Sequence, residues 1–213
     1  MVKLAIFDVD YTLTKRETLA EFYLFMILKK PTLIRHLPFG VGSFLLYVLG
    51  IIDASRSKQN FIRFINGIKE EDMKIYVKEF YEKRMSKIIY RDAIDTMRKL
   101  KQQGCLIYLI SASGDFYLNE LYNIKEVDKI IGTKFRVENG VFRNKIEGLN
   151  NKGEEKVRRL MEVLKEDGHE VDFKNSYMFS DSMADLPLFK LVGHPYLINA
   201  RKKKNNIEIL RWR

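Results

Sequence analysis

The chain has 213 residues, of which 46% are hydrophobic and 31% charged, a composition that excludes a disordered protein and fits one large domain or a core with an insertion. The formal net charge of +10 suits anionic partners such as phosphate esters, acidic membrane surfaces or nucleic acid. No nucleic-acid motif is recognisable, so we expect no nucleic-acid partner. The single cysteine, Cys105, excludes an intramolecular disulfide framework and fits a reducing cytosol.

The first predicted element is a buried strand over residues 2–7, which are mostly apolar and β-prone. It ends at two aspartates, Asp8 and Asp10, followed by a hydroxyl-rich turn. Two carboxylates held this close repel each other and are costly to bury unless a cation or a shared proton relieves them. A parallel strand that ends in carboxylates indicates a ligand-binding sheet edge, although capping of the next helix would explain such a pair taken alone.

The next segment is predicted to be helical over residues 17–30, 54–68 and 71–89. An uncharged stretch at 37–52 lies between the first two helices and, at 16 residues, is shorter than the roughly 20 needed to span a membrane. We interpret residues 15–89 as an inserted all-helical cap. The N-terminus enters a strand without a secretory signal pattern, so we expect a cytoplasmic protein.

The alternation of strands and helices resumes after the cap and predicts a catalytic core formed by residues 1–14 and 90–213. A helix is expected over 91–103, a hairpin at Asn139-Gly140, and a further helix over 153–166. Strands are expected over 105–110, 176–179 and 196–198. The fold class is therefore α/β, a Rossmann-like core with a parallel sheet, a helical cap and a β-hairpin. The basic run 201–204 and the tail to 213 fit a surface element, a membrane-facing patch or an edge strand.

Three predicted strands end in polar side chains that should meet at one edge of the sheet. The carboxylates suit a hard cation such as Mg²⁺, and a hydroxyl with an ammonium suits the oxygens of a phosphoryl group. Such a site favours phosphoryl transfer. Simple capping would explain Ser111 or Asp185 alone, whereas a lysine near a helix start is disfavoured by the helix dipole, which supports a site role for Lys152. The expected set is Asp8, Asp10, Ser111, Lys152, Asp181 and Asp185.

These residues resemble the four ordered motifs of the haloacid dehalogenase (HAD) superfamily. The matching segments are Asp8-Val9-Asp10-x-Thr12, Ser111, Lys152-Gly153 and Ser180-Asp181-x-x-x-Asp185. The cap directly after the first motif, and the hairpin before Lys152, are similar to subfamily IB, the phosphoserine phosphatase-like branch. The resemblance covers almost the whole chain.

The resemblance implies a Mg²⁺-dependent phosphatase with a covalent intermediate. Asp8 would attack phosphorus and form an aspartyl-phosphate, and Asp10 would protonate the leaving alcohol and then activate water. Ser111 and Lys152 would bind phosphoryl oxygens. Asp8, Asp181 and the backbone carbonyl of Asp10 would ligate the metal, with Asp185 in support. Tyr11 is bulkier than the Ser or Gly usual at its position, so the turn is expected to differ in shape there.

The sequence leaves two substrate classes open, a phosphoserine-like small ester and a lipid phosphate. Glu17 falls where phosphoserine phosphatases read the substrate amino group, although it also suits the first turn of a helix, and Arg63 lies near their substrate-carboxylate arginine. Ala184 stands where those enzymes carry an asparagine, which argues against phosphoserine. The apolar stretch with basic flanks instead suggests peripheral contact with the inner membrane face. The segment from Tyr23 to Pro31, the apolar run after it and Asp181-Ser182-x-x-Asp185-x-Pro187-Leu188 resemble the phosphatidylglycerophosphatase C type, which implies a lipid phosphate as substrate.

Other interpretations remain open at this point. The apolar cap residues could form the cap's own core instead of a membrane contact. A non-catalytic HAD-like binding protein would not need to retain both Asp8 and Asp10. A phosphotransferase would share the same motifs, since only exclusion of water by the cap separates it from a hydrolase.

Overall fold

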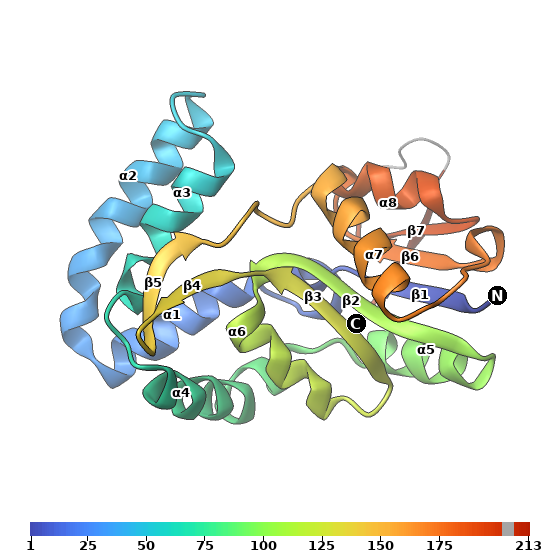
Figure 1. Cartoon of the computed structure of the whole chain (residues 1–213), viewed down its shortest axis with the longest axis horizontal. Coiled ribbons are helices and arrows are strands. Elements are labelled where there is room, and N and C mark those ends of the chain that lie inside the picture. The colour runs from blue at the N-terminus through green and yellow to red at the C-terminus, as the bar shows by residue number, and fades with distance from the viewer. Residues whose placement is uncertain (202–206) are drawn as a thin grey trace.

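The computed structural model describes residues 1–201 and 207–213 and contains a six-stranded parallel sheet with the order β3-β2-β1-β6-β7-β8 (Figure 1). The first strand of the chain therefore lies inside the sheet, between β2 and β6. The predicted α/β core is confirmed. The strands are β1 (Lys3–Phe7), β2 (Cys105–Gly114), β3 (Val127–Thr133), β6 (Tyr177–Ser180), β7 (His194–Ile198) and β8 (Glu208–Leu210).

The sheet is covered by helices on both faces, which is why its central strand is apolar without alternation. In β1, Ala5 and Phe7 join one hydrophobic cluster together with α5 (Arg91–Gln102). Leu4 and Ile6 point to the opposite face and join a second cluster. That second cluster includes side chains from α7 (Glu154–Glu166) and α8 (Leu186–Leu191).

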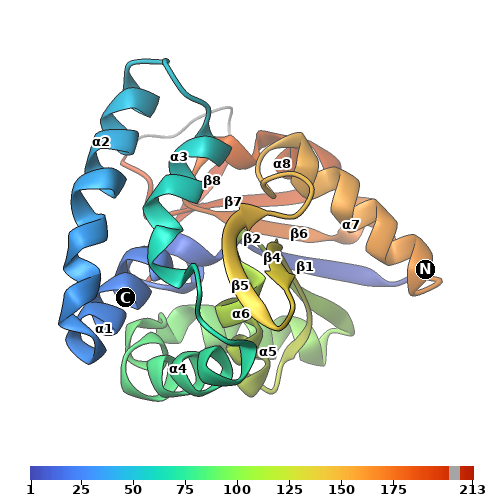
Figure 2. The ribbon, with the colours of Figure 1, turned by 60° about the vertical axis from the view of Figure 1, so that its left-hand side comes forward.

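The helical segment between β1 and α5 gathers at one end of the sheet (Figures 1 and 2). Helices α2 and α3 pack side by side and project from the body of the molecule. Within the described residues, no helix is both long enough and apolar enough to cross a membrane. The four helices are α1 (Thr18–Lys29), α2 (Leu37–Val48), α3 (Ala54–Phe61) and α4 (Glu70–Lys83); a short α6 (Asp115–Leu118) follows β2.

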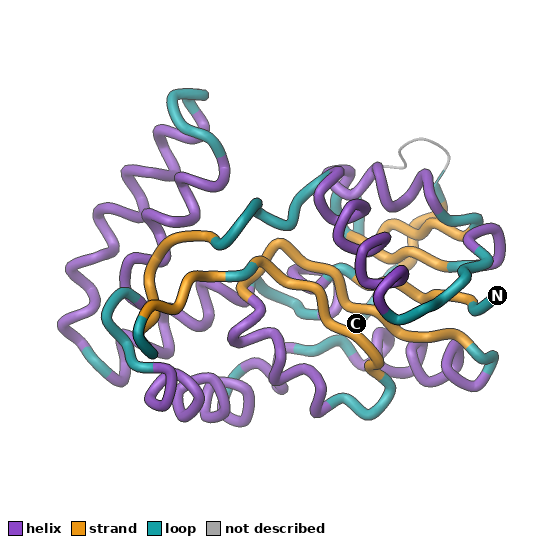
Figure 3. Tube along the Cα trace, in the orientation of Figure 1, coloured by secondary structure: helices purple, strands orange, loops and turns teal. Residues whose placement is uncertain are grey.

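The predicted hairpin is present as β4 (Phe135–Glu138) and β5 (Val141–Ile146), which form a separate two-stranded sheet. Asn139 and Gly140 both have positive φ, which the tight turn requires. The hairpin leaves the main sheet and lies against the helical segment (Figure 3). The N–H of Gly67 donates to the carbonyl of Phe142 at 3.0 Å, so the hairpin ties the cap to the core.

The tail ends as an edge strand, one of the three roles open from the sequence, because β8 pairs with β7. Trp212 is buried beyond it, with its ring centroid 6.2 Å from that of Phe7. The last three residues of the basic run, Lys202, Lys203 and Lys204, lie outside the described residues.

Candidate active site

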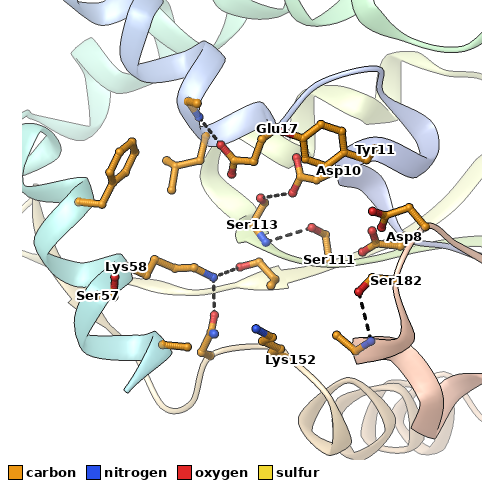
Figure 4. A pocket seen from close by; sticks show the side chains of 18 of the residues that line it. Asp8, Asp10, Tyr11, Glu17, Ser57, Lys58, Ser111, Ser113, Lys152 and Ser182 are labelled. Carbon is orange, nitrogen blue, oxygen red and sulfur yellow. Dashed lines mark hydrogen bonds between the residues drawn. The ribbon is translucent and has the colours of Figure 1, made fainter. Parts of the chain in front are cut away.

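Asp8 lies directly after β1, at the carboxyl edge of the sheet, and its side chain is largely buried. The following residues, Val9–Leu13, form a tight loop in which Asp10 and Tyr11 have non-helical backbone angles, and this loop brings the Thr12 hydroxyl within 3.5 Å of the Asp8 carboxylate. Tyr11 has a φ of 57°, an uncommon backbone conformation for a bulky residue and one that concentrates at functional sites. This unusual turn places the half-exposed Tyr11 ring at the pocket wall (Figure 4).

Asp10 is fixed by hydrogen bonds from the cap and the core at once. Its Oδ1 accepts from the backbone N–H of Thr18 at 2.7 Å and from the Thr18 hydroxyl at 2.6 Å. Its Oδ2 accepts from the Ser113 hydroxyl at 2.6 Å. Ser113 is not among the residues predicted from the sequence, although it lies two residues after Ser111, a spacing that puts both side chains on one face of an extended strand. Ser111 is buried, and its Oγ accepts from the Ser113 N–H at 3.0 Å.

The ammonium group beside Asp8 belongs to Lys156 and not to Lys152. Lys156 Nζ lies 2.7 Å from Oδ1 of Asp8 and 2.7 Å from Oδ1 of Asp185, with only 3% of the lysine side chain exposed. Lys152 also lines the pocket, and its Nζ lies 6.0 Å from the ring centre of Tyr47. The difference arises because Gly153, with a φ of 61°, turns the chain before α7 begins, and the first helical turn then directs Lys156 inward.

Asp181 and Asp185 come from the loop after β6, as the sequence predicts for a strand end. The Asp181 N–H donates to the Thr12 hydroxyl at 2.8 Å, which joins this loop to the turn after β1. Asp185 is buried and also accepts a hydrogen bond from the Ser180 hydroxyl at 2.8 Å. Burial, followed by the nearby negative charge of Asp185 and Asp10, raises the pKa of Asp181 to about 6.

The electrostatics of Asp8 follow the same pattern. Burial is the main cause that raises its pKa to about 7, with the Asp185 and Asp10 charges acting in the same direction and Lys156 opposing them. The two carboxylates beside Lys156 raise the pKa of that lysine against the effect of burial, so we treat it as protonated. The site therefore holds more negative charge than its one buried cation relieves.

The cap contributes two charged side chains to the same pocket, Glu17 and Lys58 (Figure 4). Glu17 accepts from the Ala20 N–H at 2.6 Å and so caps α1, while burial and then the Asp10 charge raise its pKa to about 7. Lys58 donates to the carbonyl of Ala112 at 2.6 Å and to the side chain of Asn150. Burial lowers the pKa of Lys58 to about 8.

Arg63, the arginine selected from the sequence, is not among the residues that line this pocket. Its guanidinium stacks over the ring of Phe39, 4.6 Å from the ring centre. The reason is local: α3 ends at Phe61, and the tighter 3₁₀ turn over Ile62–Ile65 changes the direction in which residue 63 points. Sequence spacing gave no means of choosing Lys58 over Arg63.

The pocket is a cavity of about 530 Å³ between the sheet edge and the cap. Five carboxyl groups and three lysines line it; they are Asp8, Asp10, Glu17, Asp181, Asp185, Lys58, Lys152 and Lys156. When all of them are ionised, the excess of two negative charges is one that a single divalent cation would balance. Across residues 1–201 and 207–213, no three acidic, histidine or cysteine side chains form a ready-made metal cluster. The Asp10 carboxylate does not join such a cluster, because it accepts hydrogen bonds from Thr18 and Ser113. Only the backbone carbonyl of Asp10 is then left to contact a metal. Two carboxylates, a carbonyl and water are oxygen donors that fit Mg²⁺.

Comparisons with known proteins agree with this geometry. Residues 5–190 match the model of the haloacid dehalogenase-like hydrolase family. The chain belongs to that family, and the resemblance deduced from its motifs is confirmed. It is an enzyme of the HAD phosphatase type, a phosphoric monoester hydrolase.

Three similar proteins illustrate the range of this group. A histidinol-phosphatase of Neisseria meningitidis is 25% identical over 222 residues, covering 93% of this chain and 91% of the relative. A Bordetella pertussis protein of unknown function has a crystal structure that matches with a TM-score of 0.87 at 21% identity, covering 99% and 98% of the two chains. A substrate-bound phosphoserine phosphatase matches with a TM-score of 0.69 at 19% identity, covering 98% and 93%. At these identities the two structural matches establish the fold.

Proposed function

We propose that this enzyme hydrolyses a phosphomonoester in two steps, with Asp8 as the nucleophile and Asp10 as the general acid and base. The position of Asp8 carries the proposal: it lies at the pocket wall between a buried lysine and the Asp181 loop. A carboxylate oxygen of Asp8 would attack phosphorus as the bond from phosphorus to the alcohol oxygen breaks. Asp10 would give its proton to that alcohol oxygen.

The second step would return the site to its starting state. Asp10 would take a proton from water as the water oxygen attacks phosphorus, and the bond between phosphorus and Asp8 would break, releasing inorganic phosphate. The hydrogen bonds from Thr18 and Ser113 support this assignment, because they hold the Asp10 carboxyl in one orientation. Lys156 and Ser111 would bind phosphoryl oxygens, so Lys156 takes the role that the sequence suggested for Lys152.

Magnesium is the proposed cofactor. The Asp8 and Asp181 carboxylates and the Asp10 carbonyl would hold it, and Asp185 would keep Lys156 in place. Bound Mg²⁺ supplies charge neutralisation for the phosphoryl oxygens. The excess of two negative charges among the pocket residues supports a divalent cation.

The substrate class is a proposal drawn from the pocket walls. The cavity is also lined by Leu19, Phe44, Tyr47 and Phe61, apolar side chains suited to a substrate with a hydrophobic part. That observation favours an amphiphilic ester, a lipid phosphate such as phosphatidylglycerophosphate, handled at the cytoplasmic membrane face. The alternative is a small polar ester such as phosphoserine, which Glu17 and Lys58 would read by charge.

Phosphate release tests the function and the substrate class together. The enzyme with Mg²⁺ is offered phosphoserine, small sugar and alcohol phosphates, and phosphatidylglycerophosphate in detergent, with Asp8→Asn as the matched control. Release by the wild type alone supports the hydrolase, and preference for the lipid supports the amphiphilic class. Equal rates of phosphate release by the wild type and Asp8→Asn contradict the mechanism. No release from any ester, with Mg²⁺ binding verified, favours a non-catalytic binding protein; transfer to an added acceptor alcohol indicates a phosphotransferase.

A further inference from the structure

The most unusual surface of the molecule is the outer side of helix α2 and the turn that follows it. We call the exposed side chains of Leu37–Val48, with Leu49 and Ile51, the α2 surface. Leu45 is 56% exposed, Val48 64%, Leu49 71% and Ile51 64%. Large apolar side chains exposed singly are normal, whereas a contiguous patch on one helix marks an interaction site.

The buried side of α2 is made of small residues, which leaves the large apolar residues of the helix on its exposed side. Its buried residues are Gly40 and Ser43. A Cβ at Gly40 would lie 2.8 Å from the ring of Phe61 on α3, so the glycine is what allows the two helices to approach. A helix that serves its own protein's core places its large apolar residues inward. Helix α2 does the reverse, which argues against these residues serving only as the cap's own core.

The charge around the α2 surface indicates the kind of partner. From residue 22 to residue 52 the sequence contains no Asp or Glu, while Lys30 and Arg35 precede α2 and Arg56 follows it. Lys29 also precedes α2, but its ammonium is paired with Glu79 of α4. A second copy of the chain would present the same positive charges and be repelled. An anionic lipid surface complements the basic flanks and accepts the apolar side chains at the same time.

The length of α2 determines how it would meet a bilayer. Its 12 residues extend about 18 Å at 1.5 Å per residue, less than the roughly 30 Å hydrocarbon core. The helix can therefore lie in the interface but cannot span it. Phe44 and Tyr47 belong to α2 and also line the cavity that contains Asp8, so the α2 surface adjoins the proposed catalytic pocket.

We infer that the α2 surface docks this enzyme on the anionic face of a lipid bilayer, with α2 lying parallel to the membrane. The docking itself does not depend on phosphatase chemistry. Only its purpose, which is to give amphiphilic phosphate esters access to the cavity, rests on the proposed function. A docked enzyme would have the cavity wall formed by Phe44 and Tyr47 next to the lipid.

The test is co-flotation of the full-length protein with vesicles of phosphatidylcholine containing an equal share of phosphatidylglycerol. The variant is Leu45→Gln/Val48→Gln, which changes two exposed residues outside the cavity lining. The matched control is Ile75→Gln/Met161→Gln, since Ile75 is 57% and Met161 46% exposed on α4 and α7. We expect wild type and control to float with the vesicles. The α2 variant should bind the vesicles at least about tenfold more weakly.

Hydrolysis of soluble p-nitrophenyl phosphate is measured in parallel, so a failed docking and a failed catalytic proposal are told apart. We expect equal rates for the three proteins. Wild type that stays with the unbound fraction overturns the docking, as does equal flotation of the two variants. Equal binding to pure phosphatidylcholine overturns the anionic preference. A dimer seen by sedimentation and dissociated by Leu45→Gln/Val48→Gln, without flotation, replaces the bilayer with a second copy.

Discussion

The ammonium of Lys156 lies 2.7 Å from the carboxylate of Asp8, although the two residues are 148 positions apart in the chain. The pair is buried, and Asp185 contacts the same ammonium from the other side. Isolated charges cannot be buried at this depth without partners, so each of the three depends on the other two. Lys156 is therefore expected both to stabilise the fold and to bind the phosphoryl group.

Replacing Lys156 and Lys152 separately distinguishes the two lysines. We expect Lys156→Gln to lower kcat by about 10²–10³-fold, because the developing charge on the phosphoryl group loses its nearest fixed cation. Its free energy of unfolding should fall by about 3 kcal/mol, since two buried carboxylates lose their partner. Lys152→Gln should fold as the wild type does and lose less than about tenfold in kcat. Turnover with soluble ester and urea unfolding measure both effects; the reverse ranking would return the role to Lys152.

Asp8→Asn and Asp10→Asn separate the nucleophile from the acid and base. Asp8→Asn should have no measurable turnover, because an amide oxygen is a poor nucleophile. Asp10→Asn should fold normally, since an amide oxygen can accept from Thr18 and the Ser113 hydroxyl can rotate to accept from the amide. Its kcat should fall by about 10²–10⁴-fold. Substantial turnover by Asp8→Asn in a steady-state assay would exclude the covalent route.

The strand ends were readable from the sequence because their signals are local. A run of apolar residues that stops at Asp8, Ser111 or Asp181 predicts a strand and a polar side chain near its end, and parallel pairing brings these ends together. The end of β2 was predicted too early, because the strand continues past Ser111 to Gly114. Lys152 was selected by position before a helix, but Gly153 redirects the chain. The better signal was helical spacing: Lys156 precedes Leu160 and Leu164 by four and eight residues on the buried stripe of α7. A lysine on that stripe needs a buried partner.

The cap residues could not be placed in the same way. Whether Lys58 or Arg63 reaches the pocket depends on how α3 approaches the sheet edge, and no local periodicity records that approach. The exposure of α2 is likewise a tertiary property. Its composition indicated a need for burial, whereas only the structure shows that the buried residues of α2 are Gly40 and Ser43 and that its large side chains are exposed.

Glu155 provides a prediction about stability and pH next to the site. Its carboxylate accepts from Arg158 at 2.6 Å and from Arg159 at 2.9 Å, and the hydrogen bonds from Arg158 are the main cause that lowers its pKa to about 2. A pKa below the unfolded value of 4.5 means that its stabilisation is complete above that pH and is lost as the pH falls toward 2. We expect Glu155→Gln to lower the free energy of unfolding by about 1 kcal/mol at pH 7 and by about half as much at pH 3. Urea unfolding at both pH values measures it; a pH-independent loss would indicate packing instead.

The cap contribution is tested by Lys58→Met against Arg63→Met. Lys58 uses two hydrogen bonds to hold α3 over Ala112 of β2 and over the loop at Asn150, and a third N–H remains for a substrate. We expect Lys58→Met to raise KM for an anionic ester by about tenfold with a smaller change in kcat, because the Lys156 and Asp8 region is intact.

Lys58→Arg should recover part of the loss in KM, since a cation returns to the same wall. Arg63→Met should leave KM and kcat unchanged, because Arg63 contacts Phe39 and lies outside the cavity lining. Steady-state kinetics with one soluble ester and one lipid phosphate make the comparison. If Arg63→Met raised KM and Lys58→Met did not, the cap would have to reorient on substrate binding, and α3 would then present a different residue to the substrate.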